Sequence, residues 1–256
     1  MSLYAPNISW LLPELPFAER ARRIAQAGFS ALEFGFPSYA DTEALMTLQD
    51  EYGFQVILFN QDVPVWDEAN RGYLVDPSRR DEFRTKLDEA LEIVDLLEVK
   101  KVMLPAGVEL PELSREEQRE CMLENLRYAA PLAERAELIF TIEMLNPIDN
   151  PGYYLSSTSQ GLEIVAEIDH PHIKFQLDTY HVQLTEGNVI RTLVENMPHI
   201  GHIQFADAPG RHEPGTGELD FESIRAAIRN AGYDGYIGLE YIPKAEGMDA
   251  LAWCQV

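Results

Sequence analysis

Short stretches of alternating hydrophobic and polar residues recur along this chain, and longer stretches with helical spacing separate them. The clearest of the short stretches is His199–Asp207. Within it, Ile203 and Phe205 share one face of the expected strand, and His202 and Gln204 share the other. A strand that combines an apolar face with a polar, buried face indicates the wall of a barrel, with helices outside and a polar site at the mouth.

Strand-like and helix-like stretches alternate about eight times. Strands are expected at Tyr4–Ser9, Ala31–Phe36, Gln55–Asn60, Lys101–Pro105, Phe140–Glu143, Lys174–Asp178, around Gln204, and at Ile237–Glu240. Helices are expected at Pro16–Ala27, Asp41–Tyr52, Ser78–Leu97, Ser114–Arg135, Ser157–Ile168, Asn188–Asn196, Phe221–Ala231, and in a short tail at Met248–Trp253. This alternation predicts an α/β fold with a parallel sheet, closed into a single (β/α)8 TIM barrel over residues 1–256.

Local signals mark several element boundaries. Asp41 is the candidate N-cap of the second helix, and Ser114 with Glu117 forms a capping box at the start of the fourth. Two long loops, Gln61–Pro77 and Asn146–Tyr154, are expected at the rim of the barrel. Loops of this length in compact domains are often lids or binding loops.

Four of the expected strands end in an oxygen-bearing side chain. These residues are Glu143, Asp178, Gln204 and Glu240. Because the carboxyl ends of parallel barrel strands meet at one rim, we expect the four side chains to converge. Three carboxylates would repel each other there unless a cation held them. Hard oxygen ligands with room for water or substrate favour Mg²⁺ or Mn²⁺ over a closed zinc site, so one divalent cation is predicted.

The charge of the chain narrows its partners. Its 256 residues carry a formal net charge of −23, which argues against nucleic acid, because that binding rests on Lys and Arg neutralising phosphates. The same charge argues against an anionic membrane surface. A small anionic substrate remains compatible with this net charge, provided that positively charged groups at the site bind the substrate. The oligomeric state is left open, with a homo-oligomer among the alternatives.

The expected compartment is the cytoplasm. Cys121 and Cys254 favour reduced thiols, although a single disulfide between them stays open. The N-terminus shows no basic region followed by an apolar run, as a signal peptide would. No apolar stretch approaches the roughly 20 residues that are needed to span a bilayer.

Several segments resemble the hydroxypyruvate isomerase family. They are Glu14–Phe17 with Ala27–Phe29, Leu32–Phe34, Asn125–Ala129 and Gln176–His181. The most specific match runs from His202–Gln204 through Gly210–Glu218. This family belongs to the xylose-isomerase-like barrels, which bind one divalent metal through side chains at the strand ends. The related 2-oxo-tetronate isomerases look alike at these positions, so the chain length of the substrate stays open.

The resemblance implies that Glu143, Asp178, Gln204 and Glu240 are the metal ligands. Many sugar epimerases of the group have His at the third of these positions, so Gln204 favours the hydroxypyruvate isomerase branch. One departure concerns Ile148, which lies where such isomerases often have a basic residue. If the basic residue of those isomerases binds the substrate carboxylate, another positively charged side chain must do so in this chain.

Three further residues are candidates for substrate binding. Arg211 follows a predicted ligand strand, and its guanidinium could hold a carboxylate through two hydrogen bonds. His181 lies just after Asp178 and could bond a substrate oxygen, and Arg71 lies in the first rim loop. Two other residues have structural interpretations. His202 is expected to be a satisfied barrel histidine, and Asp207 is as compatible with capping the loop as with touching the site.

Together these features predict a metal-dependent isomerase that interconverts hydroxypyruvate and tartronate semialdehyde. Glu143 and Glu240 would remove and return the proton on the way through an enediolate, and the cation would stabilise that enediolate by its charge. The alternatives are a 2-oxo-tetronate isomerase or a ketose 3-epimerase with the same site, a metal-dependent phosphodiesterase, and a non-catalytic barrel that binds a sugar acid. Six His residues in all and the charge of −23 weigh against the phosphodiesterase.

Overall fold

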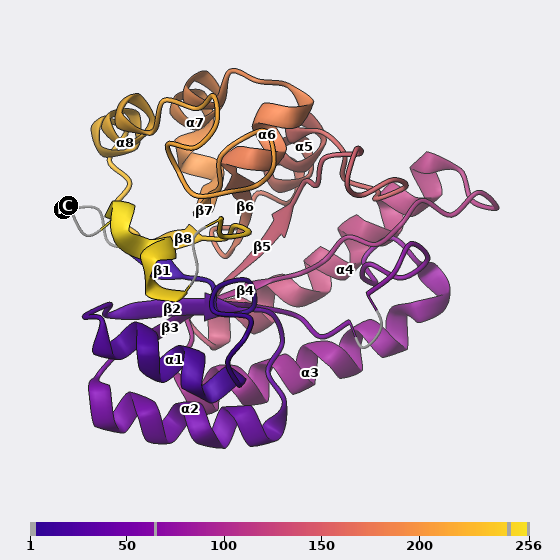
Figure 1. Cartoon of the computed structure of the whole chain (residues 1–256). Coiled ribbons are helices and arrows are strands. Elements are labelled where there is room, and N and C mark those ends of the chain that lie inside the picture. The colour runs from indigo at the N-terminus through magenta and orange to yellow at the C-terminus, as the bar shows by residue number, and fades with distance from the viewer. Residues whose placement is uncertain (1–3, 64–65, 245–246, 255–256) are drawn as a thin grey trace.

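The computed structural model describes residues 4–63, 66–244 and 247–254. In this part of the chain, parallel strands form one sheet in the order β1-β8-β7-β6-β5-β4-β3-β2 (Figure 1). The strands are β1 Tyr4–Pro6, β2 Ala31–Phe34, β3 Gln55–Asn60, β4 Lys101–Met103, β5 Ile139–Glu143, β6 Ile173–Asp178, β7 Ile200–Phe205 and β8 Ile237–Leu239. A parallel bridge between Asn7 and Glu33 links the ends of this order, where the Ile8 N–H donates to the Glu33 carbonyl at 2.9 Å. The predicted (β/α)8 barrel is confirmed.

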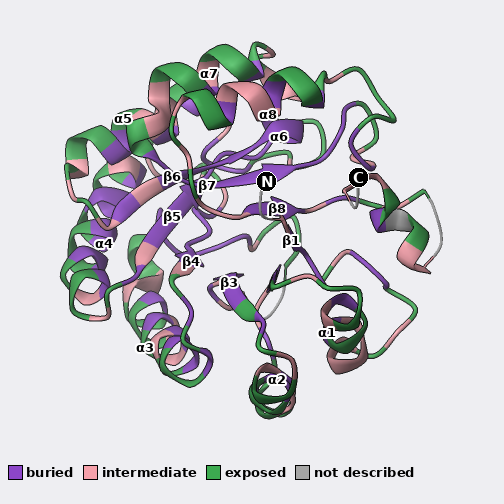
Figure 2. Ribbon diagram, turned by 90° about the vertical axis from the view of Figure 1, so that its left-hand side faces the viewer, coloured by how far each residue is buried: buried purple, intermediate pink, exposed green. Residues whose placement is uncertain are grey.

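Helices cover the outside of the barrel and turn their exposed faces to solvent (Figure 2). The α-helices are α1 Phe17–Gln26, α2 Tyr39–Tyr52, α3 Arg80–Leu97, α4 Arg115–Arg135, α5 Thr158–Ile168, α6 Thr179–Thr185, α7 Val189–Asn196 and α8 Phe221–Asn230. Short 3-10 helices are η1 Pro77–Arg79, η2 Met197–His199 and η3 Gly247–Cys254. Among the described residues, no helix is both long and apolar enough to cross a membrane.

The start of α2 corrects one boundary predicted from the sequence. Asp41 is not the N-cap, because the helix begins at Tyr39 and Ser38 caps it by accepting a bond from the Asp41 N–H. Asp41 instead lies in the first turn, where a carboxylate is stabilised by the helix dipole. The capping box of Ser114 and Glu117 at α4 is confirmed. The predicted tail helix is present as the 3-10 helix η3.

Helix α6 was not expected, and it begins directly after β6. Its Ncap is Asp178, whose side chain accepts a bond from the Tyr180 N–H. The first four residues of α6 are all buried, so the helix lacks the polar stripe by which a surface helix is found in a sequence. This short helix matters for the site because it carries His181 back toward the strand ends.

The apolar core lies between the sheet and the helices, whereas polar side chains occupy the inner face of the barrel. The buried members of this polar set are Glu33, Thr141, Gln176, His202 and Gln204. They hydrogen-bond to one another across β2, β5, β6 and β7. Buried polar groups are tolerated only where they have hydrogen-bond partners. These bonds supply the partners for the polar side chains inside the barrel. Cys121 and Cys254 are free thiols.

Candidate active site

The four predicted strand-end residues lie at the carboxyl ends of neighbouring strands. Glu143 and Asp178 are the last residues of β5 and β6, and Asp178 is in register with Gln204 of β7. Gln204 is in turn in register with Gly238 of β8. Glu240 follows β8 directly, and its N–H donates to the Phe205 carbonyl at 3.2 Å. The structure therefore brings all four to one rim, as the strand pattern predicted.

Gln176, one layer below the rim, connects two of these residues. Its Nε2 donates to Glu143 Oε2 at 3.1 Å and to Gln204 Oε1 at 2.8 Å. Its Oε1 accepts a bond from the Thr141 hydroxyl at 3.1 Å. Glu143 Oε1 has no hydrogen-bond partner among the described residues, although it is buried. One oxygen of Glu143 is thus fixed and the other is free for a ligand.

Arg211, from the loop after β7, pairs with the other two carboxylates. Its Nη2 lies 3.2 Å from Asp178 Oδ2 and 3.1 Å from Glu240 Oε1. The guanidinium also lies over the rings of Trp10 and Tyr180, at 4.4 and 5.5 Å from their centroids. Its Nε has no partner among the described residues. Arg211 was predicted to bind a substrate anion, and in this structure it neutralises two carboxylates while keeping one donor unused.

The rim holds more negative charge than its surroundings stabilise. Burial raises the pKa of Glu143 well above its usual range, and the charges of Glu240 and Asp178 raise it further. Burial also raises the pKa of Asp178 to about 7 against the lowering effect of Arg211, and it raises the pKa of Glu240 in the same way. Groups with such shifts concentrate at functional sites, and a bound divalent cation would favour their ionised forms.

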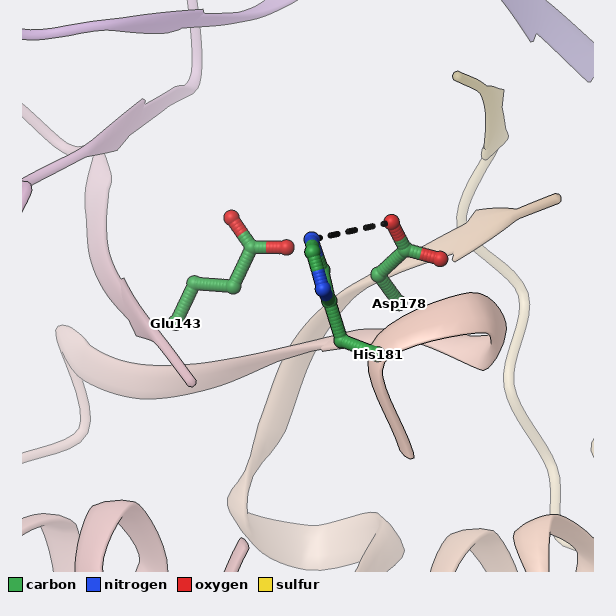
Figure 3. A group of neighbouring side chains, drawn as sticks. All are labelled: Glu143, Asp178 and His181. Carbon is green, nitrogen blue, oxygen red and sulfur yellow. Dashed lines mark ion pairs between the residues drawn. The ribbon is translucent and has the colours of Figure 1, made fainter. Parts of the chain in front are cut away.

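His181 stands between Glu143 and Asp178 (Figure 3). One donor atom from each of these residues lies within 4.8 Å of the others, which makes an acidic cluster with one histidine that could hold a metal ion. However, His181 Nδ1 accepts a bond from the Asn146 backbone N–H at 3.1 Å. Burial lowers the pKa of His181 well below its usual value, so the ring is neutral and its proton resides on Nε2.

This tautomer decides what His181 can do. A protonated Nε2 is a donor and has no lone pair for a metal. It is buried, lacks a hydrogen-bond partner among the described residues, and lies 3.7 Å from Asp178 Oδ2. The geometry therefore supports the predicted bond to a substrate oxygen, and it favours oxygen ligands for a cation. The unpartnered Glu143 Oε1 and the mutual repulsion of the rim carboxylates are compatible with a bound cation. Its ligands would be Glu143, Asp178, Gln204 and Glu240.

The remaining predicted residues have defined places. Arg71 is buried in the first rim loop, where Nε donates to the Asp67 carbonyl at 3.1 Å and Nη1 to Asn150 Oδ1 at 3.3 Å. It joins two rim loops, and its substrate role stays a prediction. Ile148 is exposed on the second of these loops. His202 bonds through both ring nitrogens inside the barrel, as expected.

Asp207 caps the loop rather than contacting the site. Its Oδ1 accepts bonds from the N–H groups of Ala208 and Leu219, and its Oδ2 accepts from those of Gly215 and Gly217, at 2.8–3.1 Å. The side chain is fully buried. One carboxylate thus organises the loop that delivers Arg211.

We predict that Asp207→Ala destabilises the protein by about 3–5 kcal/mol, since it leaves several buried N–H groups without an acceptor. The matched control is Asp220→Ala, which removes the exposed N-cap of α8 and should cost about 1 kcal/mol. Urea unfolding of the two variants measures both values. Equal losses would contradict the organising role of Asp207.

The pKa of Asp178 also predicts how stability varies with pH without metal. The native pKa of about 7 exceeds the usual 3.8, so between these values the folded state binds more protons than the unfolded state. Stability in chelator should therefore fall as pH rises from 5 to 7, by up to about 1.4 kcal/mol per pH unit for this group. Asp178→Asn should show a shallower decline in urea unfolding. The same slope in both proteins would refute the assignment.

Sequence reasoning missed Glu33, Gln176, Asn146 and Trp10. Glu33 and Gln176 alternate with apolar neighbours in their strands, which is the pattern that pointed to Glu143. They do not end their strands, so nothing placed them near the rim. Asn146 and Trp10 lie in loops, where periodicity gives no signal.

The site is nearly closed in this structure. Glu143 and Asp178 are 4% and 1% exposed, whereas the side chains of Arg211 and Glu240 are both 13% exposed. The larger hollows, of about 600 and 860 Å³, lie beside α7 and α8 and around Lys101 and Tyr236, and no predicted site residue lines them. Of these site residues, Arg211 and Glu240 are thus the most open to solvent.

Comparison with known proteins agrees with this geometry. Residues 21–255 match the family model of the xylose isomerase-like TIM barrel. The chain is 34% identical to hydroxypyruvate isomerase of Escherichia coli K12, over 99% of this chain and 98% of that protein. It is 35% identical to 2-oxo-tetronate isomerase of Cupriavidus necator, over 99% and 97% of the two chains.

A solved structure is similar over the whole fold. It is described as AP endonuclease, family 2, from Brucella melitensis, and it superposes with a TM-score of 0.95 at 31% identity, covering 100% of this chain and 98% of that one. The expected isomerase class rests on the full-length sequence relatives. The chain therefore belongs to the xylose isomerase-like TIM-barrel family, alongside hydroxypyruvate and 2-oxo-tetronate isomerases, and it is an isomerase of the aldose–ketose type.

Proposed function

We propose that this protein interconverts hydroxypyruvate and tartronate semialdehyde with one bound Mg²⁺ or Mn²⁺. The observation that carries the proposal is the convergence of Glu143, Asp178, Gln204 and Glu240 at one rim, where Glu143 is buried and the side chain of Glu240 is 13% exposed. Full-length relatives named for this substrate and for 2-oxo-tetronate support the choice of reaction. When bound, the cation would supply Lewis-acid stabilisation of the negative charge that develops on two vicinal oxygens.

Proton transfer is assigned to the two glutamates. The raised pKa of Glu143 suits a general base that works near neutral pH. Its unpartnered Oε1 would hold the cation, and its other carboxylate oxygen would accept the proton. Glu240, which pairs with Arg211 and whose pKa is also raised, would start protonated and donate its own proton to the adjacent carbon. Such acid–base assistance typically contributes about 10² to 10⁴ in rate.

Substrate binding is assigned to three donors. His181 would donate its Nε2 proton to a substrate oxygen, because no described residue accepts that bond now. Arg211 offers its unpartnered Nε to the carboxylate of the acid. Arg71 would contribute from the two rim loops that it joins. Each is a donor that could face the oxygens of an acid substrate.

The same site could serve a longer 2-oxo acid or a ketose. The test is a panel of hydroxypyruvate, four-carbon 3-hydroxy-2-oxo acids and ketoses, followed by NMR in D₂O with Mg²⁺ or Mn²⁺ present. We expect hydroxypyruvate to react fastest. If only a four-carbon acid or a ketose reacts, the proton-transfer site stands and the substrate assignment is wrong.

The phosphodiesterase alternative arises also from the description of the Brucella structure. Two observations disfavour it here. The described residues contain one acidic cluster that could hold a metal, with one histidine, rather than a cluster rich in His. The net charge of −23 opposes a phosphate backbone. A non-catalytic barrel would not exchange substrate protons with solvent, so the NMR experiment also separates that alternative.

We predict that Arg211→Ala lowers kcat/KM by at least about tenfold, mainly through KM. Loss of a charged hydrogen bond costs roughly 1.5–3 kcal/mol. The control is Arg191→Ala, whose side chain is 75% exposed and pairs with Glu195 on α7. Mn²⁺ affinity is measured in parallel, since Arg211 also pairs with two predicted ligands. Unchanged kinetics would mean that another residue binds the substrate carboxylate, and Arg71→Ala would be the next variant to measure.

A further inference from the structure

Glu33 of β2 is a fully buried carboxylate to which the mechanism assigns no task. It lies below the rim, inside the barrel, and contacts a predicted cation ligand directly. Gln204 Nε2 donates to Glu33 Oε1 at 2.6 Å, and Asn7 Nδ2 donates to the same oxygen at 3.1 Å. His202 Nε2 lies 2.7 Å from Glu33 Oε2.

The barrel is built around this carboxylate. A Cβ added at Gly238 of β8 would lie inside the van der Waals contact distance of both Glu33 oxygens, so β8 leaves room for this carboxylate by having no side chain there. Lys101 Nζ lies 3.4 Å from His202 Nδ1, so a cation faces Glu33 through the imidazole. A buried charge without partners would be costly, and these contacts supply both charge balance and donors.

The neighbours of Glu33 place hydrogen-bond donors on both oxygens of its carboxylate. Asn7 Nδ2 and Gln204 Nε2 donate to Oε1. Lys101 Nζ donates toward His202 Nδ1, so the ring presents Nε2 as its donor to Glu33 Oε2. All of these bonds are then consistent.

Glu33 Oε1 accepts hydrogen bonds from both Asn7 Nδ2 and Gln204 Nε2, and this contact fixes the amide above it. The two ends of a Gln amide are nearly equal in size, so only hydrogen bonding decides which end faces inward. Glu33 requires the nitrogen of Gln204, which leaves Oε1 on the side of Gln176 and Glu143. Gln176 Nε2 donates to that oxygen at 2.8 Å.

We propose that Glu33 is a positioning residue that orients the Gln204 amide so that its oxygen serves the cation site. Lys101 and His202 support Glu33 from below through their hydrogen bonds. This inference rests on the proposed function in one respect, namely that Gln204 is a cation ligand. Residues that orient metal ligands in this way typically change metal affinity or activity by about 10–100-fold when they are replaced.

The test measures Mn²⁺ affinity by electron paramagnetic resonance at pH 8, without substrate. Glu33→Gln preserves size but can donate as well as accept, so we expect affinity to fall by about 10–100-fold. Asn7→Ala is the matched control, because it removes another donor to Glu33 and leaves the Gln204 bond. It should change Mn²⁺ affinity by less than about threefold, although it lowers the melting temperature.

A double-mutant cycle shows whether Glu33 acts through Gln204. In a Gln204→Leu background, Glu33→Gln should cause no further loss of Mn²⁺ affinity, because the group that it orients is gone. A second measurement uses the native, metal-free protein and does not depend on Glu33 variants folding. The side-chain NH₂ signal of Gln204, identified by its absence in Gln204→Leu, should show a downfield proton with slow solvent exchange.

The outcomes separate this inference from the proposed function. If native protein binds no Mn²⁺, the cation site fails and the inference fails with it. If native protein binds Mn²⁺ but folded Glu33→Gln binds it equally well, or the losses in the cycle simply add, the positioning role is overturned while the cation site stands. A Gln204 NH₂ signal that exchanges freely with solvent overturns it as well.

Discussion

Replacing Glu143 by Gln should abolish most turnover and leave the barrel folded. The amide of Gln has nearly the same shape as the carboxylate, but it cannot accept a proton. The raised pKa of Glu143 suits that carboxylate to accept one from the substrate. We expect kcat to fall by about 10² to 10⁴. Gln can still accept the bond that Gln176 donates to Oε2, so the network below the rim survives.

Glu240→Gln should lose turnover to a similar extent, because either partner of a proton-transfer pair is required for the complete reaction. The control is Glu218→Gln, an exposed carboxylate of the neighbouring loop that bonds Gln183. Initial rates with hydroxypyruvate, together with circular dichroism, measure activity and fold in all three variants. If both site variants turn over as the native protein does, these carboxylates do not transfer the proton.

Removing divalent metal should abolish activity, and Mg²⁺ or Mn²⁺ should restore it. The three rim carboxylates with raised pKa values, Glu143, Asp178 and Glu240, repel each other, and Arg211 pairs with only the last two. A cation would favour the ionised forms of all three and would lower the barrier to forming an enediolate. In the native protein, saturating metal should also raise stability, by about 2.7 kcal/mol at a concentration one hundred times its dissociation constant.

Elemental analysis before and after chelation gives the stoichiometry, for which we expect one ion per chain. Thermal unfolding with and without Mn²⁺ gives a readout that does not depend on substrate. Asp178→Asn serves as the comparison, because it removes one predicted ligand while Asn can still cap α6. Full activity in excess chelator with no metal found would refute the cation site.

The fold could be predicted because a barrel of this kind repeats one local pattern. Apolar strands such as Gln55–Asn60 and helices with good caps, such as the one that begins after Ser114, are recognisable without tertiary information. Helix α6 could not be found in this way, since its first residues are buried on all sides and it follows Asp178 without a loop. Its position depends on packing against β6 and β7 rather than on its own periodicity.

The rim was predictable for a related reason, since parallel strands bring their carboxyl ends together. The layer below the rim was not predictable. Glu33 lies between Leu32 and Phe34 with the alternation of an ordinary strand, and only its side-chain contacts with Gly238 and Gln204 in the folded barrel show that it touches a predicted ligand. The pairing of Arg211 with Asp178 and Glu240 depends on how a long loop folds back, which Asp207 controls through bonds to four N–H groups.

The most direct measurement of the central claim is the entry of solvent deuterium into hydroxypyruvate. An enediolate formed by proton abstraction at a carbon must be reprotonated, and in D₂O some of the returned protons are deuterons. Native protein with Mn²⁺ should therefore place deuterium at the carbon-bound position of hydroxypyruvate during turnover, and Glu143→Gln should not. Conversion of hydroxypyruvate without any deuterium, or equal incorporation by native protein and Glu143→Gln, would contradict the account.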